Sequence, residues 1–211
     1  MSLWDNALAD NPLIAILRGL DPMRAVDVAD VLIDAGFRII EVPLNSPDPL
    51  VLIERIAHKH GTRAIIGAGT VLSEGDVSRV SQAGGRIIVS PNMSPAVGAR
   101  AVELGARWCP GVVTPTEAFE ALRLGASMLK FFPAEMVPPK AVAAMRAVLP
   151  PETIVAAVGG ITPETMVGYF KAGANSFGLG SALFKPSYSL NEIRERAQGF
   201  VRAYREMADN A

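Results

Sequence analysis

The sequence predicts a single (β/α)8 barrel, the TIM-barrel fold with parallel strands, as one domain over residues 1–211. Three observations lead to this fold class. Short apolar runs alternate with longer amphipathic stretches, glycine recurs where helices should end, and no linker divides the chain. With 211 residues, 50% of them hydrophobic, the chain is long enough for one domain with an ample core.

The eight strands are expected at short apolar runs, each followed by a helix-like segment. An open doubly wound sheet also alternates strands and helices, but it normally carries Gly-x-Gly-x-x-Gly after its first strand. Arg18-Gly19-Leu20-Asp21 stands at that place, which favours the closed barrel. The predicted strands are residues 13–17, 39–42, 64–66, 87–89, 108–109, 128–131, 154–157 and 176–178.

The predicted helices have recognisable ends. Six begin at a capping residue, usually followed by proline, and five end at a glycine. The last helix, over residues 190–207, is amphipathic, and its charges form a solvated face. The predicted beginnings are Asp21-Pro22, Ser46-Pro47, Ser73-Glu74, Ser94-Pro95, Thr114-Pro115 and Thr162-Pro163, and the predicted ends are Gly36, Gly84, Gly105, Gly125 and Gly173.

Composition argues against several classes of function. The net charge is -1 and the 20 basic residues are scattered, so we expect no nucleic-acid partner. A lone Cys109 forms no internal disulfide, and with His58 and His60 as the only histidines we expect no metal site. The amino terminus is neither basic nor followed by an apolar core, and no run of 18 apolar residues occurs. We therefore expect a cytoplasmic protein without a signal peptide or a membrane span.

Lys130 is the residue that most needs a functional explanation. It lies within the apolar run Ser127-Met128-Leu129-Lys130-Phe131-Phe132-Pro133, whereas the other four lysines lie in segments with solvent in reach. Burial disfavours the ammonium form and lowers its pKa, so the free amine can attack a carbonyl carbon and form a Schiff base. The alternative is an edge position, or a side chain that extends its amine to solvent.

Two more charged residues are expected near Lys130. In this fold class the functional groups lie at the C-terminal ends of the strands, where Arg18 and Glu41 also occur. A carboxylate can move protons, an arginine can hold an anion, and Arg18 could lower the pKa of Lys130 further. Alternatively, Glu41 and Arg18 serve only as partners for nearby charges, such as each other.

Glycine turns follow the seventh and eighth strands. They are Val158-Gly159-Gly160 and Gly178-Leu179-Gly180-Ser181, and barrels often hold a phosphate on backbone N–H groups at this place. Each turn alone is weak evidence, because strand–helix turns need glycine in any case. Together they predict a small phosphorylated carbonyl compound as ligand. We assign no chemistry to His58 and His60, at a solvated helix end, or to Cys109, a small buried residue.

Seven motifs spread over nearly the whole chain form a specific set. They are Ile14-Ala15-Ile16-Leu17-Arg18-Gly19, Glu41-Val42-Pro43-Leu44-Asn45-Ser46, Gly67-Ala68-Gly69-Thr70-Val71-Leu72, Val89-Ser90-Pro91-Asn92, Pro110-Gly111-Val112, Leu129-Lys130-Phe131-Phe132-Pro133 and Val158-Gly159-Gly160. In this combination the chain resembles the class I aldolases that cleave 2-keto-3-deoxy-6-phospho sugar acids to pyruvate and glyceraldehyde 3-phosphate.

The resemblance implies a role for each matching residue. Lys130 would be the Schiff-base lysine, Glu41 the proton donor and acceptor, and Arg18 a substrate ligand. No cofactor and no metal would be needed, and the protein would be a homotrimer that takes a small phosphorylated keto acid. The remaining implied substrate-binding residues are Thr70 and Pro91 beside the pyruvate part, Phe132 near the lysine, Val158, and Gly159, Gly160, Gly180 and Ser181 at the phosphate.

Three positions distinguish the types within this family. Gluconate-type members typically carry Thr two residues after the catalytic Glu and Arg four residues after it, whereas this chain has Pro43 and Asn45. They also have Thr before the paired glycines, where Val158 stands here. The chain therefore resembles the galactonate type, with the gluconate-type or a dual-specificity enzyme as the alternative. A barrel epimerase or decarboxylase, or a non-catalytic phosphate-binding barrel, would use the glycine turns without needing the buried lysine.

Overall fold

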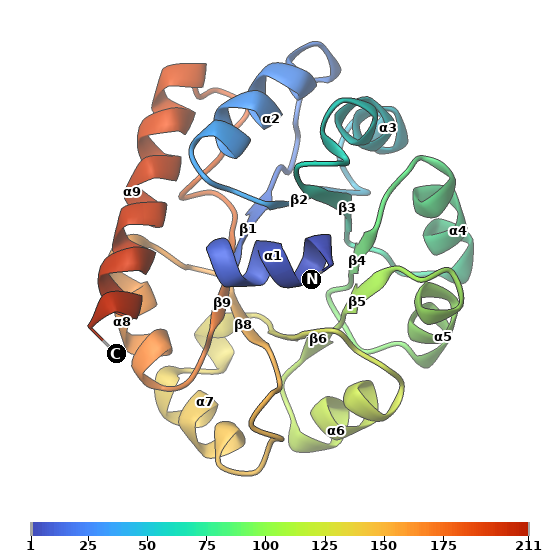
Figure 1. The fold of residues 1–211 in the computed structure, drawn as a ribbon. Coiled ribbons are helices and arrows are strands. Elements are labelled where there is room, and N and C mark those ends of the chain that lie inside the picture. The colour runs from blue at the N-terminus through green and yellow to red at the C-terminus, as the bar shows by residue number, and fades with distance from the viewer. Residues whose placement is uncertain (1, 211) are drawn as a thin grey trace.

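Parallel strands form the centre of the structure, a computed structural model that describes residues 2–210 (Figure 1). The strands pair in the order β5-β4-β3-β2-β1-β9-β8-β7-β6, and every neighbouring pair is parallel. They are β1 (Leu13–Ile16), β2 (Ile39–Pro43), β3 (Ile65–Gly69), β4 (Ile87–Val89), β5 (Arg107–Cys109), β6 (Gly111–Val112), β7 (Leu129–Phe131), β8 (Val155–Val158) and β9 (Ser176–Leu179).

The sheet closes through β5 and β6, which are two parts of one barrel strand. Only Pro110 separates them, and a proline has no N–H with which to continue a strand ladder. Its carbonyl still accepts a hydrogen bond from the Lys130 amide at 3.0 Å. Since β5 pairs with β4 and β6 pairs with β7, the ring contains eight strand positions. The predicted (β/α)8 barrel is confirmed.

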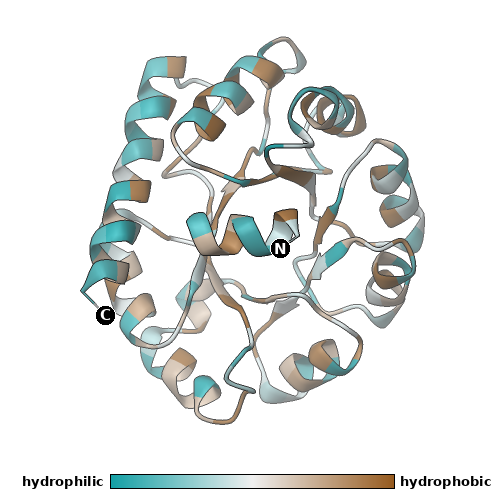
Figure 2. Cartoon of the chain, viewed as in Figure 1, coloured by the Kyte–Doolittle hydropathy of each residue, from teal (hydrophilic) through white to brown (hydrophobic). Residues whose placement is uncertain are grey.

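A helix follows each of the eight strand positions and covers the outside of the barrel (Figure 1). The helices are apolar toward the strands and polar outward, as Figure 2 shows. The predicted caps at Ser73, Thr114 and Thr162 accept the expected backbone hydrogen bonds. The eight are α2 (Ala25–Asp34), α3 (Pro49–His60), α4 (Glu74–Gln82), α5 (Pro95–Glu103), α6 (Pro115–Arg123), α7 (Pro139–Arg146), α8 (Pro163–Lys171) and α9 (Leu190–Asp209).

Two of the predicted helix beginnings are wrong. The Ser46 hydroxyl accepts a hydrogen bond from the Gly19 amide at 3.0 Å, so it joins two loops, and α3 begins only at Pro49. Asp21 caps a short 3₁₀ helix, η1 (Pro22–Arg24), and α2 begins after it. A second 3₁₀ helix, η2 (Ala134–Met136), follows β7. In both wrong cases a short polar residue before proline serves the loop instead of the main helix.

A first helix that the sequence analysis missed, α1 (Leu3–Asp10), lies across one end of the barrel (Figure 1). Trp4 is 5% exposed and belongs to the same buried cluster as Ile14, Ile39 and Ile87, which fill the barrel interior. The Ser2 hydroxyl and the Asp5 carboxylate form a capping box, and this spacing was a readable signal for the helix. Helix α1 therefore closes the N-terminal end of the barrel.

Replacing Trp4 by alanine should destabilise the protein by about 3–5 kcal/mol, because it leaves a large cavity at the end of the barrel. Urea unfolding followed by circular dichroism measures the change, with Trp4→Phe as the matched variant that keeps most of the apolar volume. A loss for Trp4→Ala below about 1 kcal/mol would mean that α1 does not close the barrel.

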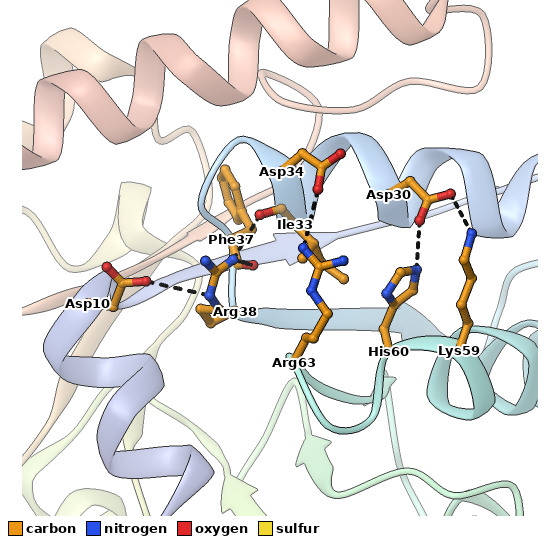
Figure 3. A network of polar contacts seen from close by, with 9 residues as sticks. All are labelled: Asp10, Asp30, Ile33, Asp34, Phe37, Arg38, Lys59, His60 and Arg63. Atoms are coloured by element: carbon orange, nitrogen blue, oxygen red, sulfur yellow. Dashed lines mark hydrogen bonds and ion pairs between the residues drawn. The ribbon is translucent and has the colours of Figure 1, made fainter.

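A polar network joins α2 to α3 at the same end of the barrel (Figure 3). Asp30 lies 2.7 Å from the Lys59 Nζ and 2.9 Å from the His60 Nε2. His58 is exposed as predicted, but the prediction of a solvated His60 is wrong, because His60 is 1% exposed. Burial lowers the pKa of His60, which favours the neutral imidazole in this contact.

No helix within residues 2–210 combines the length and the apolar character that crossing a membrane requires.

Candidate active site

Lys130 and Glu41 both line a small cavity inside the barrel. Lys130 lies on β7 and Glu41 on β2, and the cavity measures about 10 Å³, which is room for about one water molecule. Its other walls are mostly apolar. They are Ile14, Ile16, Val89, Cys109, Met128, Ala156, Val158 and Gly178. Two ionisable groups thus share a nearly dry interior.

The Lys130 side chain is 7% exposed, and its Nζ lies 4.2 Å from the centre of the Phe132 ring. Burial lowers the pKa of Lys130 below its ordinary value of 10.5, and the nearby positive charge of Arg18 acts in the same direction. Glu41 opposes both effects. Strand β7 pairs with β6 and with β8, so Lys130 does not lie at a sheet edge. The site favours a free amine that can act as a nucleophile.

Glu41 is 2% exposed, and its Oε2 has no hydrogen-bond partner within residues 2–210. Burial raises the pKa of Glu41 from 4.5 to about 7, although the charges of Lys130 and Arg18 and a hydrogen bond from the Gly69 backbone oppose the rise. The carboxyl group can therefore give or accept a proton near neutral pH. Burial lowers the pKa of Lys130 and raises the pKa of Glu41, and both shifts favour the neutral form of the group.

Gly69, at the end of β3, leaves room for the Glu41 carboxyl group. A Cβ at this position would lie 2.0 Å from the Glu41 Oε2, so any other residue would push the carboxyl group away. Gly69→Ala should reduce kcat by about 10²-fold while the barrel still folds. Steady-state kinetics checks this, with Gly199→Ala as the control, because a Cβ at Gly199 meets nothing within 4 Å. An active Gly69→Ala variant would contradict this position for Glu41.

Arg18 lies two residues beyond β1, at the exposed mouth of the site. Its Nη1 donates a hydrogen bond to the Asn45 Oδ1 at 2.6 Å. In the sequence, Asn45 stands where the gluconate type has arginine, and no contact with Arg18 was predicted for it. This hydrogen bond shows that Asn45 orients Arg18. The contact could not be predicted, because no sequence pattern pairs residues from two different loops.

A larger cavity of about 470 Å³ adjoins the first, and Ile16, Val158 and Gly178 line both. Seven of the predicted substrate-binding residues line it, and they come from four different strand ends. These are Arg18, Phe132, Val158, Gly159, Gly160, Gly180 and Ser181. Lys185, Tyr188 and Arg196 also line this cavity, although the sequence analysis gave them no role.

Two predicted residues do not line either cavity. Thr70 follows β3 and is one of the non-glycine residues with positive φ, at 56°. The carbonyl oxygen of Pro91 would lie 2.2 Å from a Cβ placed on Gly111, so it packs against β6. Their predicted contacts with the pyruvate part stay predictions.

Cys109 faces the same interior as Lys130. Burial raises the pKa of the Cys109 thiol to about 12, so the group stays protonated and unreactive at neutral pH. Within the described part of the chain, residues 2–210, no three His, Cys, Asp or Glu side chains gather as metal ligands would. Lys130 and Glu41 thus remain the groups with the strongest reason to carry chemistry.

Known proteins match this chain along nearly its whole length. A protein of Rhizobium meliloti (strain 1021) described as a probable 2-dehydro-3-deoxy-6-phosphogalactonate aldolase is 49% identical over 195 residues, which are 92% of each chain. The 2-dehydro-3-deoxy-6-phosphogalactonate aldolase of Escherichia coli (strain K12) is 45% identical over 203 residues, 96% of this chain and 98% of its own.

A solved structure and a family model give the same result. The structure, described as "Native KDPGal structure", superposes with a TM-score of 0.92 at 44% identity and covers 94% of this chain and 96% of its own. The model described as "Aldolase: KDPG and KHG aldolase" matches residues 4–196. These matches confirm the resemblance that the motifs indicate. The chain is an aldolase and belongs to the KDPG and KHG aldolase family.

Proposed function

We propose that this aldolase cleaves 2-dehydro-3-deoxy-6-phospho-D-galactonate to pyruvate and D-glyceraldehyde 3-phosphate through a Schiff base on Lys130. One observation carries the proposal: a buried lysine and a buried carboxyl group, both with pKa values shifted toward the neutral form, line a small cavity that shares wall residues with the larger cavity of the glycine turns. The names of both relatives support the choice of substrate.

The first half of the reaction builds an electron sink on Lys130. The free amine attacks the C2 carbonyl of the substrate and forms a carbinolamine. Glu41 donates its proton to the departing hydroxyl group, so water leaves and a positively charged iminium remains. Glu41 is then a carboxylate. The raised pKa suits this step, because a group with a pKa near 7 is partly protonated at neutral pH.

The second half breaks the carbon–carbon bond. The Glu41 carboxylate takes the proton of the C4 hydroxyl, the C3–C4 bond breaks, and its electrons move to C3 and the iminium nitrogen. Glyceraldehyde 3-phosphate leaves, and an enamine remains on Lys130. Glu41 returns its proton to C3, and water then hydrolyses the resulting iminium to pyruvate. The last step restores the free amine and the protonated Glu41, so the cycle closes.

The remaining contacts hold the two ends of the substrate. Arg18, oriented by Asn45, can bind the carboxylate of the keto acid, since a guanidinium holds a carboxylate through charge-assisted hydrogen bonds. Phe132 packs beside the Lys130 amine. The backbone N–H groups after β8 and β9 and the Ser181 hydroxyl face the phosphate end. Thr70 and Pro91 lie beside the pyruvate part of the substrate in this proposal, as the family resemblance implies.

The preference between the two C4 epimers tests the substrate. The wild-type enzyme should show a higher kcat/KM for the galactonate epimer than for the gluconate epimer. Val158→Thr should raise the relative rate on the gluconate epimer by about tenfold, because it adds a hydroxyl group to the cavity that receives the substrate. A wild-type enzyme that prefers the gluconate epimer would overturn this choice of substrate.

We also propose a cytoplasmic homotrimer. Apolar side chains are exposed on the α5 and α6 side of the barrel, among them Val102 on α5, Leu104 directly after it and Phe119 on α6, and self-association would cover them. The cytoplasmic location is proposed because the lone cysteine is buried and free, so the protein forms no internal disulfide that would need an oxidising compartment. Light scattering on the eluted protein should give three times the chain mass, and a monomer at micromolar concentration would contradict the trimer.

A further inference from the structure

Two basic residues line the outer part of the larger cavity. Lys185 lies in the segment between β9 and α9, and Arg196 lies on α9. Both line the cavity together with Ser181 and Gly160, which belong to the predicted phosphate-binding turns. The predicted phosphate site contains backbone amides and a hydroxyl group but no charge. The structure therefore adds two positive charges where the sequence analysis expected none.

The ring of Tyr188 lies against both basic groups. The guanidinium carbon of Arg196 is 4.3 Å from the ring centre, and the Nζ of Lys185 is 5.6 Å from it. These are distances at which a cation is attracted to an aromatic ring. The Nη1 of Arg196 also donates a hydrogen bond to the Ala182 carbonyl at 3.2 Å. Contacts with a ring and a carbonyl limit the orientation of Arg196 without neutralising its charge.

The segment that carries Lys185 and Tyr188 is itself held in place. Arg24, at the end of η1, donates to the Pro186 carbonyl at 2.8 Å and to the Tyr188 carbonyl. On the same side, a Cβ at Gly19 would lie 3.1 Å from the Pro186 ring. The loop after β1, which carries Arg18, and the loop after β9 are thus fastened together.

No carboxylate neutralises the two cations. Within residues 2–210, neither Lys185 nor Arg196 lies within 4.0 Å of an Asp or Glu oxygen, and no acidic side chain lines the cavity. Glu192, one turn before Arg196 on α9, feels the charge of Arg196, but its carboxylate accepts the capping hydrogen bonds of Ser189 and forms no ion pair with the guanidinium. Glu135 lies against Gly159 and Gly160, but it is not part of the cavity wall. An anion entering the cavity therefore meets two positive charges, neither of which is held in an ion pair within residues 2–210.

We propose that Lys185 and Arg196 bind the terminal phosphate of the substrate and select phosphorylated over unphosphorylated keto acids. This inference rests on the proposed function, since it deepens the same site. A phosphate monoester carries close to two negative charges at neutral pH, which two cations match better than backbone amides alone. A guanidinium can also bind two phosphate oxygens at once.

Binding of sn-glycerol 3-phosphate, an unreactive analogue of the phosphorylated product, tests the inference without relying on turnover. Calorimetric titration should show binding to the wild-type protein, with the affinity about tenfold weaker in Lys185→Ala and in Arg196→Ala. The matched controls Lys140→Ala and Arg194→Ala each remove an exposed charge of the same kind outside the cavity, and they should bind as the wild type does. Arg196→Lys should recover part of the lost affinity.

Steady-state kinetics separates the contribution of phosphate binding from that of the chemical step. Both alanine variants should lose about tenfold in kcat/KM for the phosphorylated substrate, while cleavage of the unphosphorylated analogue stays within about twofold of wild type. Equal affinity for sn-glycerol 3-phosphate in all variants would overturn the inference, as would a wild-type protein that does not bind it. Borohydride trapping of pyruvate on Lys130 tests the proposed function separately, because pyruvate carries no phosphate.

Discussion

Replacing Lys130 by methionine should abolish cleavage and reduce kcat by about 10⁴-fold or more, since the amine forms the covalent intermediate. The variant should fold and unfold at no lower urea concentration than the wild type, because methionine fills a similar apolar space without burying an amine. A coupled assay for pyruvate release measures the activity, and circular dichroism measures the unfolding.

Lys140→Met is the matched control for this substitution. Lys140 is exposed on α7, so its replacement removes one amine without touching the cavity, and activity should stay within about twofold of wild type. If Lys130→Met retains more than about a tenth of the wild-type kcat, another group carries the reaction.

Replacing Glu41 by glutamine should lower kcat by about 10²–10⁴-fold, because the amide cannot exchange protons with the substrate. The same substitution should stabilise the folded protein at alkaline pH. In the wild type, the pKa of Glu41 is about 7 in the folded state against 4.5 ordinarily. A carboxyl group whose pKa is raised by folding weakens the folded state once the unfolded chain can ionise.

The stability of the wild-type protein should change with pH in a definite direction. Below about pH 4.5 both states keep the proton on Glu41, and the carboxyl group has no effect on stability. Between about pH 4.5 and 7 the unfolded chain releases the proton and the folded protein keeps it, so wild-type stability falls as the pH rises. Above pH 7 the loss is complete, at most about 3 kcal/mol.

Urea unfolding of wild type and Glu41→Gln at pH 5 and pH 8 measures this loss. From pH 5 to pH 8, the free energy of unfolding of the variant should rise relative to that of the wild type by up to about 3 kcal/mol. The same difference in stability at both pH values would show that folding does not raise the pKa of Glu41.

The barrel could be predicted because its signals are local and repeated. Each strand is a short apolar run, most of the helices around the barrel end next to a glycine, and caps such as Thr114 and Thr162 act through their own backbone neighbours. The buried Lys130 is a signal of the same kind, since its apolar neighbours are adjacent in sequence. Patterns within about ten residues therefore located the strands and the buried lysine.

The features that could not be predicted depend on contacts between distant segments. The sequence places His60 at a solvated helix end, but in the structure it is buried, and Asp30 on another helix lies beside it. The hydrogen bond from Arg18 to Asn45 joins two loops, and Arg196 lines the cavity from α9, a helix that packs against α2 and α8. Helix α1 is a different case, because its capping box was readable and was missed.

The most direct test of the central claim is to trap the covalent intermediate. The protein is incubated with pyruvate and sodium borohydride, digested, and mapped by mass spectrometry, with Lys130→Met treated in parallel. The Schiff-base mechanism predicts a reduced pyruvate adduct on Lys130 of the wild-type protein and none on the other lysines or on the variant. A folded wild-type protein without an adduct on Lys130 would contradict the Schiff-base mechanism.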